Sequence, residues 1–175
     1  MKERYDIYIG IDPDVEKSGV AELDAYSHTF KKLKAMTFPE LLDYLAANHF
    51  DCASSIVTPR YLVVIEAGWL NKAHWHLTPR DTRAIAAAKG NAAGRNHEVG
   101  RKIAECCEAW GYPYKLVKPL RKCWRGKDGK ITHEELAYFT HIEGRTNQEV
   151  RDAALLAWNE AGLPIRVQPI KTKRQ

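Results

Sequence analysis

The sequence predicts an α/β fold in which a five-stranded sheet is flanked by helices. Two apolar runs, YDIYIGID and YLVVIEAG, have the β-branched and aromatic composition of buried strands. Segments with apolar residues at helical spacing follow the third strand and then alternate with the remaining strands. The chain has 175 residues, 45% of them hydrophobic, which suits a single domain with one core of ordinary size.

The first three strands are expected to form an antiparallel meander. Residues 5–12 form the first strand, which ends on Asp12, and a turn leads into the second strand at residues 19–24. Residues 28–36 are more polar and should form a third strand nearer an edge of the sheet. Thr37 is then placed to cap a helix whose apolar residues repeat at helical spacing.

The middle of the chain returns to the sheet and then forms a long helix. Residues 61–66 read as a strand covered on both faces, and this strand ends on Glu66. The connection at residues 67–89 is long enough to be either functional or partly helical. Residues 91–110 are expected to form one helix, which Gly111 ends.

The last third of the chain is expected to contain one strand and two helices. A short fifth strand at residues 112–117 is followed by a basic loop. Thr132 and Glu135 have the capping-box spacing, which predicts the start of a helix at residues 132–140. The final helix is expected to begin at residue 146 or 147 and to stop before Gly162.

Residues 1–162 are expected to form one domain, and residues 163–175 a basic C-terminal tail. No apolar run approaches the length of about 20 residues that a bilayer requires, and the N-terminus lacks the design of a signal peptide. We therefore expect a cytoplasmic protein without a membrane partner. The four cysteines have no C-x-x-C spacing and are expected to be reduced, although a zinc site that combines them with histidines stays an alternative.

Positive charge is concentrated after the fifth strand. The formal net charge is +5 and the isoelectric point is about 9.0, which by itself says little about a partner. The loop and its flanks carry one acidic residue and a run of basic ones: Lys115, Lys118, Arg121, Lys122, Arg125, Lys127 and Lys130. Together with Arg80 and Arg83 of the long connection, these residues are candidates for contacts with nucleic-acid phosphates.

Four carboxylates are the candidate catalytic and metal-binding residues. Asp12 and Glu66 each end an apolar strand, and Glu149 and Asp152 lie three residues apart on the final helix. Taken singly, they are also explained by turn chemistry or by the helix dipole. If the first and fourth strands are neighbours, however, the carboxylates converge, and their mutual repulsion is relieved by divalent cations. Two such ions support phosphodiester hydrolysis.

These segments resemble the RuvC-type Holliday-junction resolvases of the ribonuclease-H-like superfamily. The resemblance covers residues 5–161 and depends on IGIDPDVEKSGVAELD, VVIEAG and EVRDAALLAW in that order. It implies a ribonuclease-H-like mixed sheet, in which three antiparallel strands are followed by two parallel ones. It also implies two Mg²⁺ or Mn²⁺ ions, a homodimer, and a four-way DNA junction as the substrate that is nicked symmetrically.

The resemblance also assigns roles by position. Asp12, Glu66 and Asp152 match catalytic carboxylates of the family, and Glu149 replaces an aspartate of the family's D-x-x-D motif. Lys118 resembles the first of two family lysines near the scissile phosphate, whereas His133 stands where the second is expected. Lys130 is an alternative for that second position. Divergence elsewhere suggests a phage or mobile-element relative.

Other functions stay open at this point. The chain could cut other branched DNA or RNA-containing substrates, because the catalytic core alone does not encode substrate shape. It could also be an inactive nucleic-acid-binding module, although four retained acidic positions argue against that. A sugar-kinase-like or actin-like ATPase would need phosphate-binding glycine loops and a second comparable domain, and the sequence has neither.

Overall fold

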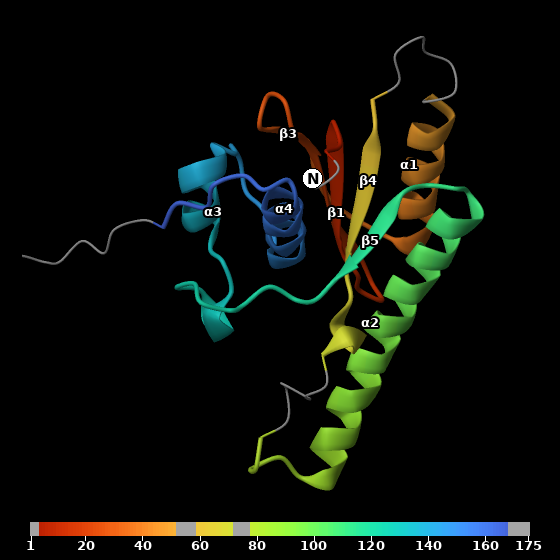
Figure 1. The fold of residues 1–175 in the computed structure, drawn as a ribbon. Helices are drawn as coiled ribbons and strands as arrows, with labels where there is room; N and C mark the ends of the chain where they lie inside the picture. Colours follow the sequence, from red (N-terminus) through yellow and green to blue (C-terminus); the bar gives the residue numbers. More distant parts are fainter. Residues whose placement is uncertain (1–3, 52–58, 72–77, 168–175) are drawn as a thin grey trace, which may run out of the picture.

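The protein is described by a computed structural model that covers residues 4–51, 59–71 and 78–167 (Figure 1). Its strands are β1 (Ile7–Asp12), β2 (Ser18–Asp24), β3 (Thr29–Met36), β4 (Tyr61–Glu66) and β5 (Tyr114–Val117). Its α-helices are α1 (Phe38–Asp51), α2 (Arg83–Ala109), α3 (His133–Thr140) and α4 (Gln148–Glu160). Two short 3₁₀ helices, η1 (Gly68–Leu70) and η2 (Lys127–Gly129), lie in the connections.

The five strands form one mixed sheet in the order β3-β2-β1-β4-β5. β1 pairs antiparallel with β2, which pairs antiparallel with β3, and β1 pairs in parallel with β4, which pairs in parallel with β5. The prediction of a mixed sheet with three antiparallel strands followed by two parallel ones is confirmed. The first and fourth strands are neighbours, as the convergence of the carboxylates requires.

Helices cover both faces of the sheet (Figure 1). α3 and α4 lie on one face, where their apolar residues pack with side chains such as Tyr8 and Leu62. α1 and α2 lie on the other face and pack with the alternate strand residues, including Ile9 and Val63. Because side chains of a strand alternate between faces, each strand contributes to both cores.

Two glycines allow α4 to approach the backbone of the sheet directly. A β-carbon on Gly10 of β1 would lie 2.1 Å from the carbonyl oxygen of Ala153, and one on Gly19 of β2 would lie 2.0 Å from that of Glu149. Real β-carbons do not approach backbone atoms so closely, so any other residue at these positions would push the helix outward. The first turns of α4 are thereby held against the end of β1.

α2 begins earlier than expected. The structure starts this helix at Arg83, not at residue 91, and the side chain of Thr82 accepts a hydrogen bond from the backbone N–H of Ile85. The added turns are rich in alanine, which favours helix, but they are largely exposed. An exposed segment carries no apolar periodicity, so the sequence pattern indicated these residues only as part of a connection that could be partly helical.

The other predicted helix starts agree with the structure. The Thr132 hydroxyl accepts from the backbone N–H of Glu135, whose carboxylate accepts from the backbone N–H of Thr132, so the capping box is confirmed.

At the end of the chain, the predicted tail begins in close contact with α4. Leu163 donates its backbone N–H to the carbonyl of Trp158, and the Trp158 indole donates to Pro164.

Within the described ranges, no helix combines the length and apolarity that a bilayer crossing requires. Cys106, Cys107 and Cys123 are free thiols, and Cys52 lies outside the described residues.

Candidate active site

The strand-end carboxylates lie on the face of the sheet that α4 covers. In β1, Tyr8 belongs to the core beneath α4, so Asp12, four residues later, points to the same face. In β4, Val64 belongs to that core, so Glu66 also points toward α4. Ile11 of β1 pairs with Ile65 of β4, which brings the two carboxylates to the ends of adjacent strands.

The final helix adds the other two carboxylates. Asn147 caps α4 by accepting a hydrogen bond from the backbone N–H of Val150 at 3.0 Å. Glu149 therefore falls in the first turn, and its carbonyl packs on Gly19, the residue that pairs with Asp12. Asp152 lies one turn further along the same helix.

Asp12 is within electrostatic reach of the other three carboxylates. The pKa of Asp12 is raised well above its usual value by burial, with further contributions from the charges of Glu66, Asp152 and Glu149. The pKa of Glu66 is raised to about 7 by burial and by the charge of Asp152. Like charges at short range disfavour the ionised form, so the site holds more negative charge than its surroundings neutralise.

Lys130 supplies the nearest positive charge. Its ammonium donates to Oδ2 of Asp152 at 3.0 Å, and both side chains are partly exposed, by 34% and 19% respectively. Burial alone would lower the pKa of Lys130, but the hydrogen bond to Asp152 and the charges of Asp12 and Glu149 outweigh it and raise the pKa. Lys130 is therefore a stable cation at ordinary pH.

Gln148 also contacts Asp152, and the sequence interpretation did not include it. Its side-chain amide donates to Oδ1 of Asp152 at 2.8 Å. The signal was present in the sequence, because residues four apart on a helix lie on the same face. Gly10 and Gly19 were missed in the same way, although glycine inside a strand marks close backbone approach.

The donor chemistry of the site fits a hard divalent cation, but its arrangement is not that of a ready metal site. Mg²⁺ and Mn²⁺ prefer carboxylate oxygens, and the four acidic side chains supply only such donors. In the part of the chain that the structure describes, however, no group of three or more His, Cys, Asp or Glu side chains is placed to hold a metal ion. Two of the oxygens, both on Asp152, are bound to Lys130 and Gln148 instead.

The lack of such a group among the described residues also gives no support to the alternative zinc site.

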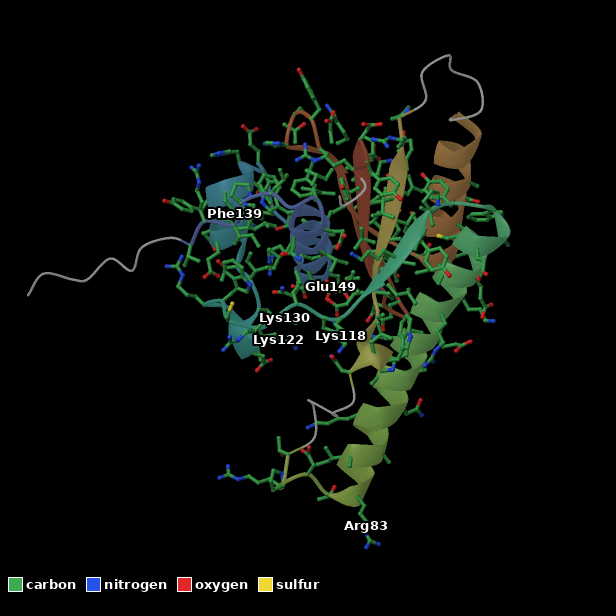
Figure 2. The ribbon with its side chains drawn as sticks, viewed as in Figure 1. Arg83, Lys118, Lys122, Lys130, Phe139 and Glu149 are labelled. Atoms are coloured by element: carbon green, nitrogen blue, oxygen red, sulfur yellow. The ribbon has the colours of Figure 1, made fainter. Side chains whose placement is uncertain are left out.

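The basic residues after β5 divide into two groups. Lys115 pairs with the buried Glu160 at 2.7 Å, and Arg125 pairs with the buried Glu135 at 3.2 Å, so both stabilise the fold. Four others have exposed side chains and no ion pair with any described residue: Lys118, Arg121, Lys122 and Lys127. Figure 2 shows Lys118, Lys122 and Lys130 in the same region as Glu149, and Lys122 is close enough to Glu66 to lower its pKa.

The remaining candidates lie apart from the carboxylates. The His133 ring is 3.1 Å from the Thr146 hydroxyl, and Lys130 rather than His133 contacts a carboxylate of the set. Arg80 and Arg83 are exposed, and Figure 2 shows Arg83 at the tip of α2, remote from Glu149.

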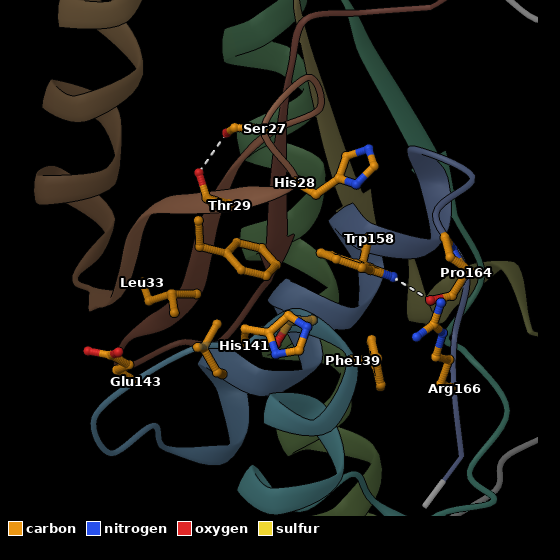
Figure 3. Close-up of a pocket in the computed structure, with 13 residues that line it drawn as sticks. Ser27, His28, Thr29, Leu33, Phe139, His141, Glu143, Trp158, Pro164 and Arg166 are labelled. Atoms are coloured by element: carbon orange, nitrogen blue, oxygen red, sulfur yellow. Dashed lines mark hydrogen bonds between the residues drawn. The ribbon is translucent and has the colours of Figure 1, made fainter.

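A separate hollow of about 540 Å³ lies between the β2–β3 turn and the C-terminal ends of α3 and α4 (Figure 3). Its lining includes His28, His141, Trp158 and Arg166. Asp24, just before that turn, pairs with Ile7 at the start of β1, whereas Gly19 pairs with Asp12 at its end. The hollow and the carboxylates are therefore at opposite ends of the sheet, and none of the candidate site residues lines the hollow.

Comparisons with known proteins leave the family unassigned. No family model matches the chain. Curated relatives include glyoxylate/hydroxypyruvate reductase A of Salmonella heidelberg and of Salmonella typhimurium, each 35% identical over 69 residues, or 39% of this chain. The match covers 21% of each reductase, so the chain spans about a fifth of the length of those relatives. No two glycines here are two residues apart, so the G-x-G-x-x-G fingerprint of dinucleotide binding is missing.

Among solved structures, the chain is similar to T. thermophilus RuvC in complex with a Holliday junction substrate. The TM-score is 0.48 and the sequence identity 12%, over 89% of this chain and 96% of that chain.

Proposed function

We propose that this chain is a metal-dependent endonuclease that resolves four-way DNA junctions by symmetric phosphodiester hydrolysis. One observation carries the proposal. Asp12, Glu66 and Asp152 come from three separate elements, yet the pairing of β1 with β4 and the packing of α4 bring them to the same edge of the sheet. There burial, and then the charges of Glu66 and Asp152, raise the pKa of Asp12. An arrangement that concentrates unneutralised carboxylates is costly for folding, and such groups are typical of functional sites.

In this proposal, the acidic residues bind metal ions and the basic residues bind phosphates. Asp12, Glu66, Glu149 and Asp152 would hold two Mg²⁺ or Mn²⁺ ions, which supply Lewis-acid activation of the phosphodiester and of a water molecule. The exposed cations of the loop after β5 would bind the flanking phosphates. Lys118 follows Val117, the residue of β5 that pairs with Glu66, so its backbone lies directly beside the carboxylate edge.

The choice of a branched substrate depends on the sequence motifs that resemble the RuvC-type resolvases. Symmetric cleavage of a junction requires two active sites, so a homodimer is part of the proposal. The loop at residues 118–130 carries exposed cations that would contact the phosphates of such a substrate. Cleavage of other branched DNA or of RNA-containing substrates would use the same carboxylates.

A second candidate function is supported by a specific observation. Asp152 is already bound by Lys130 and Gln148, and no metal-holding group is assembled among the described residues. A protein that binds nucleic acid without cleaving it could keep such an internally neutralised site. This alternative predicts that the protein binds junctions without divalent cations. It also predicts that the wild type does not cleave them, so that carboxylate substitutions have no cleavage to remove.

The deciding experiment incubates the protein with end-labelled four-way junction, linear duplex of the same sequence and RNA:DNA hybrid, each with Mg²⁺, Mn²⁺ or EDTA. We expect paired nicks in opposite strands of the junction with either metal and no product in EDTA. If only the RNA:DNA hybrid is cleaved, the protein is a ribonuclease and not a junction resolvase. Junction binding with no cleavage in any metal would favour the second candidate.

Asp43→Asn provides a matched control for the carboxylates. Asp43 is an exposed acid on α1, on the face of the sheet opposite α4. Its substitution should leave cleavage unchanged, while Asp12→Asn should remove it.

A further inference from the structure

Both oxygens of the Asp152 carboxylate are bound by side chains of this protein. Lys130 donates to Oδ2 at 3.0 Å, and Gln148 donates to Oδ1 at 2.8 Å. Each oxygen of the carboxylate thus already accepts one hydrogen bond, and a metal ion would compete with these two donors for Asp152. Lys130 is 22 residues away in the sequence, so this contact is made by the tertiary fold.

The backbone beside Lys130 is fixed to α4 by a clamp around Arg151. The guanidinium of Arg151 donates Nε to the carbonyl of Ile131 at 3.0 Å and also donates to the carbonyl of Thr146. A third guanidinium nitrogen donates to the side-chain oxygen of Gln148 at 2.9 Å. Because Ile131 follows Lys130 directly and is itself buried, the Lys130 backbone keeps its place when the side chain moves.

The Lys130 side chain itself can leave. Its side chain is 34% exposed, and Figure 2 shows Lys130 in the same region of the view as Lys122, Lys118 and Glu149. Ion pairs of partly exposed side chains contribute only modestly to stability, so a stronger competing cation can replace the ammonium. The clamp would hold Asp152 and the loop in position during such an exchange.

We propose that Lys130 is a tethered competitor for the metal site, which must release Asp152 before that carboxylate can bind a divalent cation. The inference rests on the proposed metal-dependent function and adds a coupling to it. Release of Asp152 turns the ammonium of Lys130 toward the surface where substrate phosphates would bind. Metal binding and phosphate binding are then linked through one side chain, and each favours the other.

This coupling differs from a fixed structural ion pair. If Lys130 only supports the fold of the site, its removal weakens or does not change metal binding. If Lys130 competes with the cation, its removal strengthens metal binding but leaves the substrate without a phosphate contact. The sign of the change in metal affinity therefore separates the two roles.

The test titrates Mn²⁺ into the full chain without DNA by isothermal calorimetry, and measures junction cleavage at saturating Mn²⁺ separately. Lys130→Gln keeps a hydrogen-bond donor for Asp152 and removes the charge. Lys122→Ala is the matched control, because Lys122 is close enough to lower the pKa of Glu66 but forms no ion pair with the described residues. Thermal unfolding without metal establishes that each variant is folded.

We expect Lys130→Gln to bind Mn²⁺ roughly three- to tenfold more tightly than the wild type, given the usual strength of such pairs, and to cleave more slowly at saturating metal. Lys122→Ala should tighten Mn²⁺ binding less, because it removes only a nearby charge. Affinity in Lys130→Gln that is unchanged, weaker, or no tighter than in Lys122→Ala would overturn the inference. So would tighter binding with an unchanged rate of cleavage.

Failure of the proposed function would look different. If the wild type does not bind Mn²⁺, or if Asp12→Asn leaves its Mn²⁺ binding unchanged, the proposed metal site is absent and both proposals fail. If an Asp12-dependent site is present and only the effect of Lys130→Gln is missing, the proposed function stands and the coupling does not.

Discussion

Asp12 and Glu66 stand on one face of the sheet, each one residue beyond Ile11 and Ile65, the last paired residues of the parallel strands β1 and β4. Adjacent strands lie about 4.8 Å apart, so two acidic side chains are held beside each other at a half-buried edge. Burial raises the pKa of Asp12 and of Glu66, and the charge of Asp152 raises both further. The charge of Glu66 also contributes to the raised pKa of Asp12. The properties of the site follow from this pairing.

Glu66→Gln is expected to stabilise the metal-free protein at high pH. The pKa of Glu66 is raised from 4.5 to about 7 in the folded state, so the fold favours the protonated carboxyl. Between these values the folded protein binds a proton that the unfolded chain releases, and stability falls as pH rises through the window. At pH 8 the full penalty is present, and its removal should raise the free energy of unfolding by on the order of 1–3 kcal/mol.

Urea unfolding in EDTA at pH 5 and at pH 8 measures this difference. The gain from Glu66→Gln should be much larger at pH 8 than at pH 5. Glu40→Gln is a control of opposite sign, because a hydrogen bond from the backbone N–H of Thr37, aided by Lys34, lowers the pKa of Glu40 to about 2. Equal effects of Glu66→Gln at both pH values would show that the carboxyl is not perturbed.

Asp12→Asn is expected to abolish cleavage while junction binding is retained. The amide removes a charged oxygen ligand, whereas contacts with phosphate come from the basic loop. Binding measured by fluorescence anisotropy in EDTA should change less than threefold, a difference of well under 1 kcal/mol, and nicking in Mg²⁺ should disappear. Loss of binding together with cleavage would mean that Asp12 supports the fold rather than the chemistry.

Gly19→Ala is expected to impair both stability and cleavage. The added β-carbon would lie 2.0 Å from the carbonyl oxygen of Glu149, so α4 must move outward and take its carboxylates with it. Overpacking of this kind costs about 1–3 kcal/mol, and a shift of about 1 Å in a catalytic group can slow a reaction about 100-fold.

Gly94→Ala is the matched control for that substitution. No atom lies within 4 Å of the position that its β-carbon would take, and Gly94 is inside α2. Alanine is the better helix former, so stability should rise by up to about 1 kcal/mol with cleavage unchanged. Circular-dichroism melts and the junction assay measure both variants, and equal effects of the two would contradict the close contact of α4 with β2.

Neutralisation of Lys118, Arg121 and Lys122 together is expected to weaken junction binding and to flatten its dependence on salt. Each phosphate contact releases counterions, so three lost contacts should reduce the slope of log K against log salt by up to about 2.7. Substitution of Lys31, Lys32 and Lys34, which are exposed on the edge strand β3, removes the same charge elsewhere. If the two triple variants have the same salt slope, the loop is not the contact.

Much of the fold could be read from local patterns. The strand bounds at residues 61–66, the capping box at Thr132 and the start of α4 after Asn147 agree with the structure because each depends on neighbouring residues. The connection at residues 67–89 is partly helical, which was one of the two alternatives, but the start of the long helix was expected at residue 91 and lies at Arg83, since an exposed alanine-rich segment carries no apolar periodicity. The ion pairs of Lys115 with Glu160 and of Arg125 with Glu135 were not anticipated, because these partners are ten or more residues away in the sequence.

The sequence by itself determined the order and type of the elements, the strand ends at which Asp12 and Glu66 lie, and the acidic character of the site. These depend on periodicity, capping and turn chemistry, which act over a few residues. Only the tertiary structure decided how closely α4 approaches Gly10 and Gly19, that Lys130 binds Asp152, and which loop cations stay exposed. Such contacts join residues far apart in the chain, and their formation depends on how closely the packed elements approach.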